Sequence, residues 1–201
     1  MTDLTRFRAF IQSFTRLVES AGGHEAQLFA EGEPLLRELI ADDDWLPEVF
    51  ATAARDRYQQ YLLWCDPLER FSVVSFVWAP GQRTPIHDHT VWGMVGVLRG
   101  AERCEEFSRD PSTGNLVAGK VHPLPAGSVD QVSPRIGDIH RVSNALPDRP
   151  SVSIHVYGAN VGTLQRHVFD PATGAAAPFV SGYSNASLPN PWLPAGGRPP
   201  A

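Results

Sequence analysis

Short runs of β-branched and aromatic residues, broken by Gly, Pro and Asp, dominate the chain from about residue 57 to residue 170. Runs of this length at regular spacing are typical of strands in a sandwich or barrel. We therefore expect a mainly β body. The predicted strands are 58–64, 71–78, 91–98, 101–107, 127–132, 139–142, 151–157 and 165–169.

Two helices are predicted before this body. Apolar residues recur at three- and four-residue steps, the period of one helical face, at Leu4, Phe7, Phe10, Ile11, Phe14, Leu17 and Val18. Gly22 and Gly23 then end the pattern. A second helical stretch passes through Leu35, Leu36, Leu39 and Ile40 and ends at the acidic run 42–44, which we interpret as a solvated turn. Both helices are expected to cover the β body.

The 201 residues suit one structural domain with three parts. We expect a helical cover over residues 1–56 and a β-barrel over residues 57–170. Residues 171–201 are rich in Pro, Gly, Ala and Ser and predict an extended tail on the surface.

Composition excludes several classes of function. The chain has 22 acidic and 17 basic residues, a net charge of -5, and no basic stripe, so a nucleic-acid partner is not expected. No run of eighteen apolar residues suggests a membrane span, and the N-terminus has no apolar signal segment, so we expect a cytoplasmic protein. Cys65 and Cys104 are too few for a disulfide framework and are interpreted as packed thiols.

The histidines carry the main functional signal. His87 and His89 are two residues apart, so both side chains lie on the same face of an extended strand. Imidazole suits iron, zinc, copper and nickel, and His140 is the natural third ligand from another strand. By itself, such a pair is more often a surface or hydrogen-bonded feature than a metal site.

Two spaced patterns strengthen the metal interpretation: Gly81-x5-His87-x-His89 followed by Gly100, and Gly137-x2-His140-x3-Asn144. Together they resemble the paired motifs of the cupin superfamily. The resemblance implies a small double-stranded β-barrel, or jelly roll, with the three histidines as metal ligands. The first motif usually contains a Glu ligand, but Gly93 occupies its place. The Pro of the second motif is replaced by Arg135.

A three-histidine cupin without that Glu resembles the cysteine dioxygenase family, and the resemblance covers most of the chain, including PIHDHT and the strand at 151–157. It implies a ferrous iron cofactor, Fe(2+), with O2 and a small thiol as substrates. It also implies that Ser153, His155 and Tyr157 form a hydrogen-bonded network beside the metal. Three neutral ligands would leave the metal its full charge for binding a thiolate.

Two departures from animal cysteine dioxygenases concern the substrate. Gly93 stands where those enzymes have a Cys crosslinked to the active-site Tyr, so Tyr157 is expected to be unmodified. Gln60 stands where they have a carboxylate-binding Arg. This combination resembles the bacterial 3-mercaptopropionate dioxygenases, which implies that Arg166 binds the substrate carboxylate through its planar guanidinium and that Gln60 lines the pocket.

The resulting hypothesis is oxidation of 3-mercaptopropionate, a small thiol carboxylate, to its sulfinate, 3-sulfinopropionate. Oxidation of cysteine is the nearest alternative. A non-catalytic cupin that binds a metal or ligand, and a zinc or manganese isomerase, remain as alternatives of other classes. We interpret His24, His122 and His167 as structural or exposed. The oligomeric state does not follow from the sequence.

Overall fold

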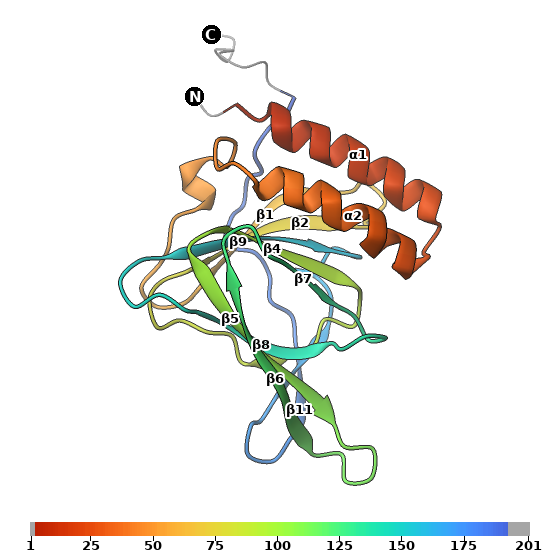
Figure 1. Cartoon of the computed structure of the whole chain (residues 1–201), viewed down its shortest axis with the longest axis vertical. Coiled ribbons are helices and arrows are strands. Elements are labelled where there is room, and N and C mark those ends of the chain that lie inside the picture. The colour runs from red at the N-terminus through yellow and green to blue at the C-terminus, as the bar shows by residue number, and fades with distance from the viewer. Residues whose placement is uncertain (1–2, 193–201) are drawn as a thin grey trace.

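The computed structural model describes residues 3–192, and within these residues two helices precede two β-sheets that face each other (Figure 1). The helices are α1 (Thr5–Ala21) and α2 (Glu25–Ile40), followed by the short 3-10 helix η1 (Glu48–Phe50). The strands are β1 (Gln59–Cys65), β2 (Ser72–Trp78), β3 (Ile86–His87), β4 (Gly93–Arg99), β5 (Ala101–Arg109), β6 (Leu116–Pro125), β7 (Val129–Val132), β8 (Ile139–Asn144), β9 (Ser151–Tyr157), β10 (Arg166–Phe169) and β11 (Ala176–Phe179).

The predicted amphipathic helix is confirmed as α1. Its apolar stripe is buried, and Phe14, near its middle, has no exposed surface. Gly22 ends the helix with a φ of 53°, a left-handed conformation that costs glycine little. Helices α1 and α2 lie side by side across the outer face of the five-stranded sheet (Figure 1).

The five-stranded sheet has the order β1-β2-β9-β4-β7, and its central strand β9 has two chemically different faces. Val152, Ile154 and Val156 pack in the same apolar cluster as the helices. The alternate residues of the strand point into the barrel, because successive side chains of a strand point to opposite faces. Tyr157 accordingly packs with Val142 of the opposite sheet. The helical cover thus leaves the inner face of β9 free to carry polar groups.

The six-stranded sheet has the order β11-β10-β3-β8-β5-β6 and forms the other wall of the barrel. Its antiparallel register places His87 of β3 directly opposite His140 of β8. The two metal-ligand candidates that are far apart in the sequence therefore become neighbours through strand pairing.

Each predicted strand overlaps an observed one, but three strands were missed. β3 has only two residues. β6 is an edge strand whose side chains are mostly exposed, so it lacks the apolar alternation of a half-buried strand, and the edge tolerates Pro123 and Pro125. β11 lies in the predicted tail, where it pairs with β10. The last part of that tail, residues 193–201, lies outside the described residues.

The acidic run after α2 is engaged in ion pairs with arginines. Asp42 and Asp44 contact Arg6, and Asp43 contacts Arg99. The carboxylates are partly exposed, in agreement with a turn instead of a metal site. No helix within residues 3–192 combines the length and the apolar character needed to cross a bilayer.

Candidate active site

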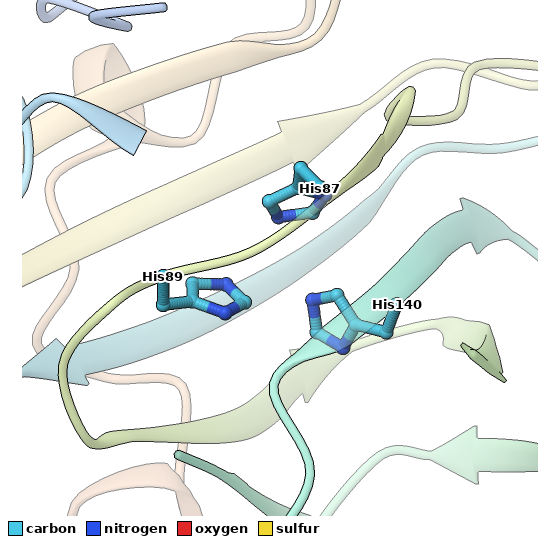
Figure 2. A group of neighbouring side chains, drawn as sticks. All are labelled: His87, His89 and His140. Atoms are coloured by element: carbon cyan, nitrogen blue, oxygen red, sulfur yellow. The ribbon is translucent and has the colours of Figure 1, made fainter. Parts of the chain in front are cut away.

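Three histidines meet inside the barrel (Figure 2). The ring centroids of His87, His89 and His140 lie 4.8–4.9 Å apart, and their candidate ligand atoms all lie within 4.8 Å of one another. All three side chains are buried, and His89 has no exposed surface. The structure thus brings together the three residues predicted as ligands.

Each imidazole is held through its Nδ1 atom. His87 Nδ1 lies 3.1 Å from the carbonyl oxygen of Pro85, and His89 Nδ1 lies 3.1 Å from Oδ1 of Asp138. His140 Nδ1 lies 3.6 Å from Sγ of Cys104. These contacts leave Nε2 of each ring for coordination, and Nε2 of His89 is buried without a hydrogen-bond partner among the described residues. The residues therefore fit a metal ion with three imidazole ligands.

Asp138 was not singled out by the sequence reasoning. Its carboxylate accepts hydrogen bonds from the backbone N–H groups of His89 and Thr90 in addition to the contact with the His89 ring. Burial alone would raise its pKa, but these hydrogen bonds outweigh burial and hold the pKa below its ordinary value. Asp138 therefore remains ionised and fixes the His89 ring. The sequence signal that could have identified Asp138 was its position two residues before His140.

Two of the ligand candidates, His87 and His140, are neutral bases. Burial is the main cause that lowers their pKa values well below the ordinary value, and neighbouring His89 adds to the effect. Neutral imidazole is the form that coordinates a metal. A set of three imidazole ligands, with no carboxylate, would leave the full charge of a divalent ion for an anionic substrate.

The inner face of β9 carries a hydrogen-bonded chain. Ser153 Oγ lies 2.8 Å from His155 Nε2, and His155 Nδ1 lies 2.8 Å from the Tyr157 hydroxyl. The ring of Tyr157 stacks on that of His89, with centroids 5.3 Å apart and an interplanar angle of 19°. The predicted network residues are therefore in contact with one another and adjacent to the three-histidine cluster.

Arg166 is buried, with 3% of its surface exposed, although it is a cation. One guanidinium nitrogen donates to Ser181 Oγ at 2.8 Å, and the group lies 4.7 Å from the centroid of the Phe179 ring. Its Nε has no hydrogen-bond partner, and no salt bridge to Arg166 is found among residues 3–192. Burial lowers the pKa of Arg166 because desolvation disfavours the charged form. An anionic ligand would relieve this cost.

Gln60, on β1 of the five-stranded sheet, contacts the same residue, Ser181, as Arg166 does. Its side-chain amide donates to Ser181 Oγ at 3.0 Å and to the carbonyl oxygen of Gly182 at 2.9 Å. Ser181 thus links Gln60 to Arg166. A pocket of about 350 Å³ opens here, lined by Arg57, Tyr58, Gln60, Pro85 and residues 179–184. The sequence reasoning treated the segment 179–184 as surface tail and missed its contribution to the site.

Comparison with known sequences identifies a family. A family model described as cysteine dioxygenase type I matches residues 41–170. The chain belongs to this family. Cysteine dioxygenase type 1 of Rattus norvegicus is 28% identical and that of Homo sapiens 29% identical, each over 107 residues. The match covers 52% of this chain and 52% of each relative. The chain therefore spans about half the length of the relatives that it matches.

Solved structures with partial similarity include an uncharacterized conserved protein with a double-stranded beta-helix domain from Klebsiella pneumoniae. Its TM-score is 0.44 at 20% identity, covering 60% of this chain and 94% of that protein. A cupin-like protein from Thermotoga maritima has a TM-score of 0.41 at 20% identity, covering 58% of this chain and 80% of that protein.

His24 and His167 lie outside the three-histidine cluster. His24 is exposed at the start of α2. His167 is partly exposed, and its Nδ1 lies 2.9 Å from Oδ2 of Asp88. Neither belongs to the group of His87, His89 and His140, and their exposed or partly exposed positions agree with the sequence interpretation.

His122 belongs to a second group of potential ligands, together with Cys104 and Asp130. Its Nε2 lies 3.1 Å from Oδ2 of Asp130, and its Nδ1 lies 3.3 Å from Oε1 of Glu106. Both ring nitrogens therefore face carboxylates. Burial raises the pKa of the Cys104 thiol, which keeps it protonated against His140. We interpret His122, Asp130 and Glu106 as a local polar cluster outside the ligand set.

Proposed function

We propose that the chain is a thiol dioxygenase that uses Fe(II) and O2 to convert 3-mercaptopropionate to 3-sulfinopropionate. The observation that carries the proposal is the buried guanidinium of Arg166, which has no carboxylate partner among the described residues. The positive charge of Arg166 contributes to the lowered pKa of His87, after burial and neighbouring His89. The cation and the ligand cluster therefore lie in the same interior of the barrel. A short molecule with a thiol and a carboxylate fits these two features.

His87, His89 and His140 would hold the iron. When bound, ferrous iron supplies a site for thiolate sulfur and the electrons needed to activate O2. Other divalent ions accept imidazole ligands too, but the oxidation of sulfur requires a metal that changes its redox state. Family membership and the all-histidine ligand set support iron.

Arg166 would bind and orient the substrate carboxylate. A guanidinium can form two parallel hydrogen bonds to a carboxylate, and these are strong where water is excluded. Stacking on Phe179 and the bond to Ser181 limit the orientations of the guanidinium. The carboxylate contact would then place the sulfur at the metal, and such positioning lowers the entropic part of the barrier.

Tyr157 would act on the reacting end of the substrate. Burial raises the pKa of its hydroxyl, so the group remains protonated and can donate a hydrogen bond. His155 and Ser153 fix the direction of that hydroxyl through the two 2.8 Å contacts. Stacking on His89 places the tyrosine ring beside the proposed ligand set.

Cysteine is the second candidate substrate, because the relatives are named cysteine dioxygenase type 1. Cysteine differs from 3-mercaptopropionate by an α-ammonium group, which would need acceptors near Arg166. Gln60, whose side-chain nitrogen donates to Ser181 and Gly182, is neutral and offers that ammonium group no negative charge. A single buried cation with neutral neighbours suits a substrate whose only charged group besides the thiolate is a carboxylate.

Oxygen uptake by the iron-loaded protein with 3-mercaptopropionate, cysteine and cysteamine tests the proposal, with sulfinate measured as product. We expect the highest kcat/KM for 3-mercaptopropionate, and we expect each product molecule to contain two oxygen atoms that come from O2. A higher kcat/KM for cysteine would identify a cysteine dioxygenase. No uptake with any of the thiols would favour a non-catalytic metal- or ligand-binding cupin.

A further inference from the structure

Glu102 is a carboxyl group enclosed in the barrel interior. It lies on β5, has no exposed surface, and forms no salt bridge among the described residues. Both of its carboxyl oxygens are buried without a completed hydrogen bond. A buried carboxyl group without such bonds is costly to the fold. Such a cost is typical of a group retained for function.

The polar groups that face Glu102 come mainly from β9. The hydroxyl groups of Ser151 and Ser153 and the indole of Trp78 approach the carboxyl group without closing to hydrogen-bonding geometry, and Ser151 Oγ and Trp78 Nε1 also lack partners. Burial raises the pKa of Glu102 to about 7, and these three groups offset only part of the rise. Both protonation states of Glu102 are therefore accessible near neutral pH.

Ser153 approaches this carboxyl group and also belongs to the chain on β9. Burial, with a smaller contribution from His89, lowers the pKa of His155 well below its ordinary value, so its ring is neutral and has one N–H donor and one acceptor. The hydrogen bonds of Ser153, His155 and Tyr157 must therefore all run in one direction. Either Tyr157 donates inward and Ser153 donates to Glu102, or the whole sequence is reversed and the Tyr157 O–H points outward.

We propose that Glu102 is the inner end of this chain and that its carboxylate takes up the proton released when the substrate thiol binds as thiolate. The inference rests on the proposed thiol dioxygenase function. One proton enters at the Tyr157 oxygen, the Tyr157 proton moves to His155 Nδ1, the Nε2 proton moves to Ser153 Oγ, and the Ser153 proton moves to Glu102. No net charge remains on the three intermediate residues.

The transfer also reverses the direction of the chain. With Glu102 ionised, His155 carries its proton on Nε2 and the Tyr157 hydroxyl donates to Nδ1. With Glu102 protonated, His155 carries its proton on Nδ1 and the Tyr157 hydroxyl is free to donate to the substrate. Glu102 thereby acts as a positioning residue through Tyr157.

The surroundings of Glu102 contain few competing ionisable groups. Its register partners are Leu124 in β6 and Asn144 in β8, neither of which titrates. The titratable side chains influenced by its charge are Cys104 on the same strand and Tyr157 on β9, and the pKa values of both are raised, chiefly by burial. His155 is the remaining ionisable member of the chain and stays neutral. A pH-dependent change of the chain near neutral pH would therefore be assigned to Glu102.

Nitrogen-15 NMR of the histidine rings in the metal-free protein tests the proposal directly, with His155→Asn used to assign the signal. In the wild type, the proton of His155 should move from Nδ1 to Nε2 as the pH rises from about 5.5 to 8.5. Glu102→Gln, which has nearly the same shape but cannot ionise, should hold one tautomer throughout. Glu105→Gln on the same strand is the matched control and should behave as the wild type.

A wild-type His155 that keeps one tautomer over this range would overturn the proposal, as would an unchanged switch in Glu102→Gln. If Glu102→Gln does not fold, Ser153→Ala provides the same test, because it removes the link and should abolish the pH-dependent switch. In the iron-loaded wild type, kcat/KM should fall below neutral pH as Glu102 is protonated. Glu102→Gln should lower kcat/KM about 10-fold or more and should not show this fall. A pH-dependent tautomer change of His155 without oxidation of any thiol would support the hydrogen-bonded chain from Tyr157 to Glu102 but refute the proposed thiol dioxygenase function.

Discussion

Gly93 lies directly opposite Tyr157 in the ladder between β4 and β9, and a Cβ atom at position 93 would stand 2.7 Å from Cδ1 of the tyrosine ring. The absence of a side chain at this position therefore allows the ring to occupy its place beside His89. It also means that position 93 offers no sulfur to Tyr157, while Cys65 and Cys104 are both free thiols.

We expect Tyr157 to be unmodified in the purified protein. Peptide mass spectrometry should recover the peptide containing Tyr157 at its unmodified mass, and the intact polypeptide should be a single species. A thioether between Tyr157 and Cys65 or Cys104 would refute this prediction.

Gly93→Ala should lower the free energy of unfolding by about 1 to 3 kcal/mol, because the buried ring of Tyr157 must shift to make room. Denaturant unfolding of the variant and the wild type measures the difference.

Replacing a metal ligand should remove the metal and leave the fold. His140→Ala is expected to lose bound iron and oxygen uptake, because two imidazoles alone hold the ion weakly. Iron content and thermal unfolding of the purified variants provide the measurement. His24→Ala and His122→Ala are the matched controls and should retain iron and turnover. Retained iron and activity in His140→Ala would show that the ligand set is misassigned.

Asp138→Asn tests the residue that orients His89. The amide keeps the size of the side chain but removes the negative charge that accepts hydrogen bonds from the His89 ring and from two backbone N–H groups. We expect metal affinity to fall by about 10- to 100-fold. A competition titration with a metal chelator measures this change. An unchanged affinity would mean that strand geometry alone orients His89.

Tyr157→Phe removes one hydroxyl group and leaves its hydrogen-bond partner, His155 Nδ1, without that 2.8 Å contact. Iron should remain bound, since Tyr157 is not a ligand in our assignment, while oxidation should become slower or less well coupled to oxygen uptake. The ratio of sulfinate formed to oxygen consumed measures the coupling. Wild-type rate and coupling in this variant would exclude the hydroxyl from the reaction.

Much of the fold could be predicted because its signals are local. The stripe around Phe14 and the stop at Gly22 define α1, and alternation along 151–157 defines β9. Strand β6 was missed because exposed side chains on an edge strand leave no burial pattern to recognise. Strand β11 was missed because pairing with β10, rather than its own composition, makes it a strand.

The same distinction applies to the candidate site. His87, His89 and His140 have a recognisable spacing, and the network on β9 follows from period-two alternation combined with a family resemblance. Ser181 and Glu102 carry no comparable signal, because their contacts with Arg166 and Ser153 depend on which strands become neighbours across the barrel. Long-range register decides those contacts, and a local pattern does not reveal it.

The most direct test of carboxylate recognition compares the wild type with Arg166→Lys in steady-state oxygen uptake, using 3-mercaptopropionate and cysteamine as substrates. Lysine keeps the charge but loses the planar pair of donors, so kcat/KM for 3-mercaptopropionate should fall by the equivalent of about 2 to 5 kcal/mol. Cysteamine has no carboxylate, and its kcat/KM should be nearly unchanged. Equal losses for both thiols, or no loss for either, would contradict the assignment of Arg166 as the group that binds the substrate carboxylate.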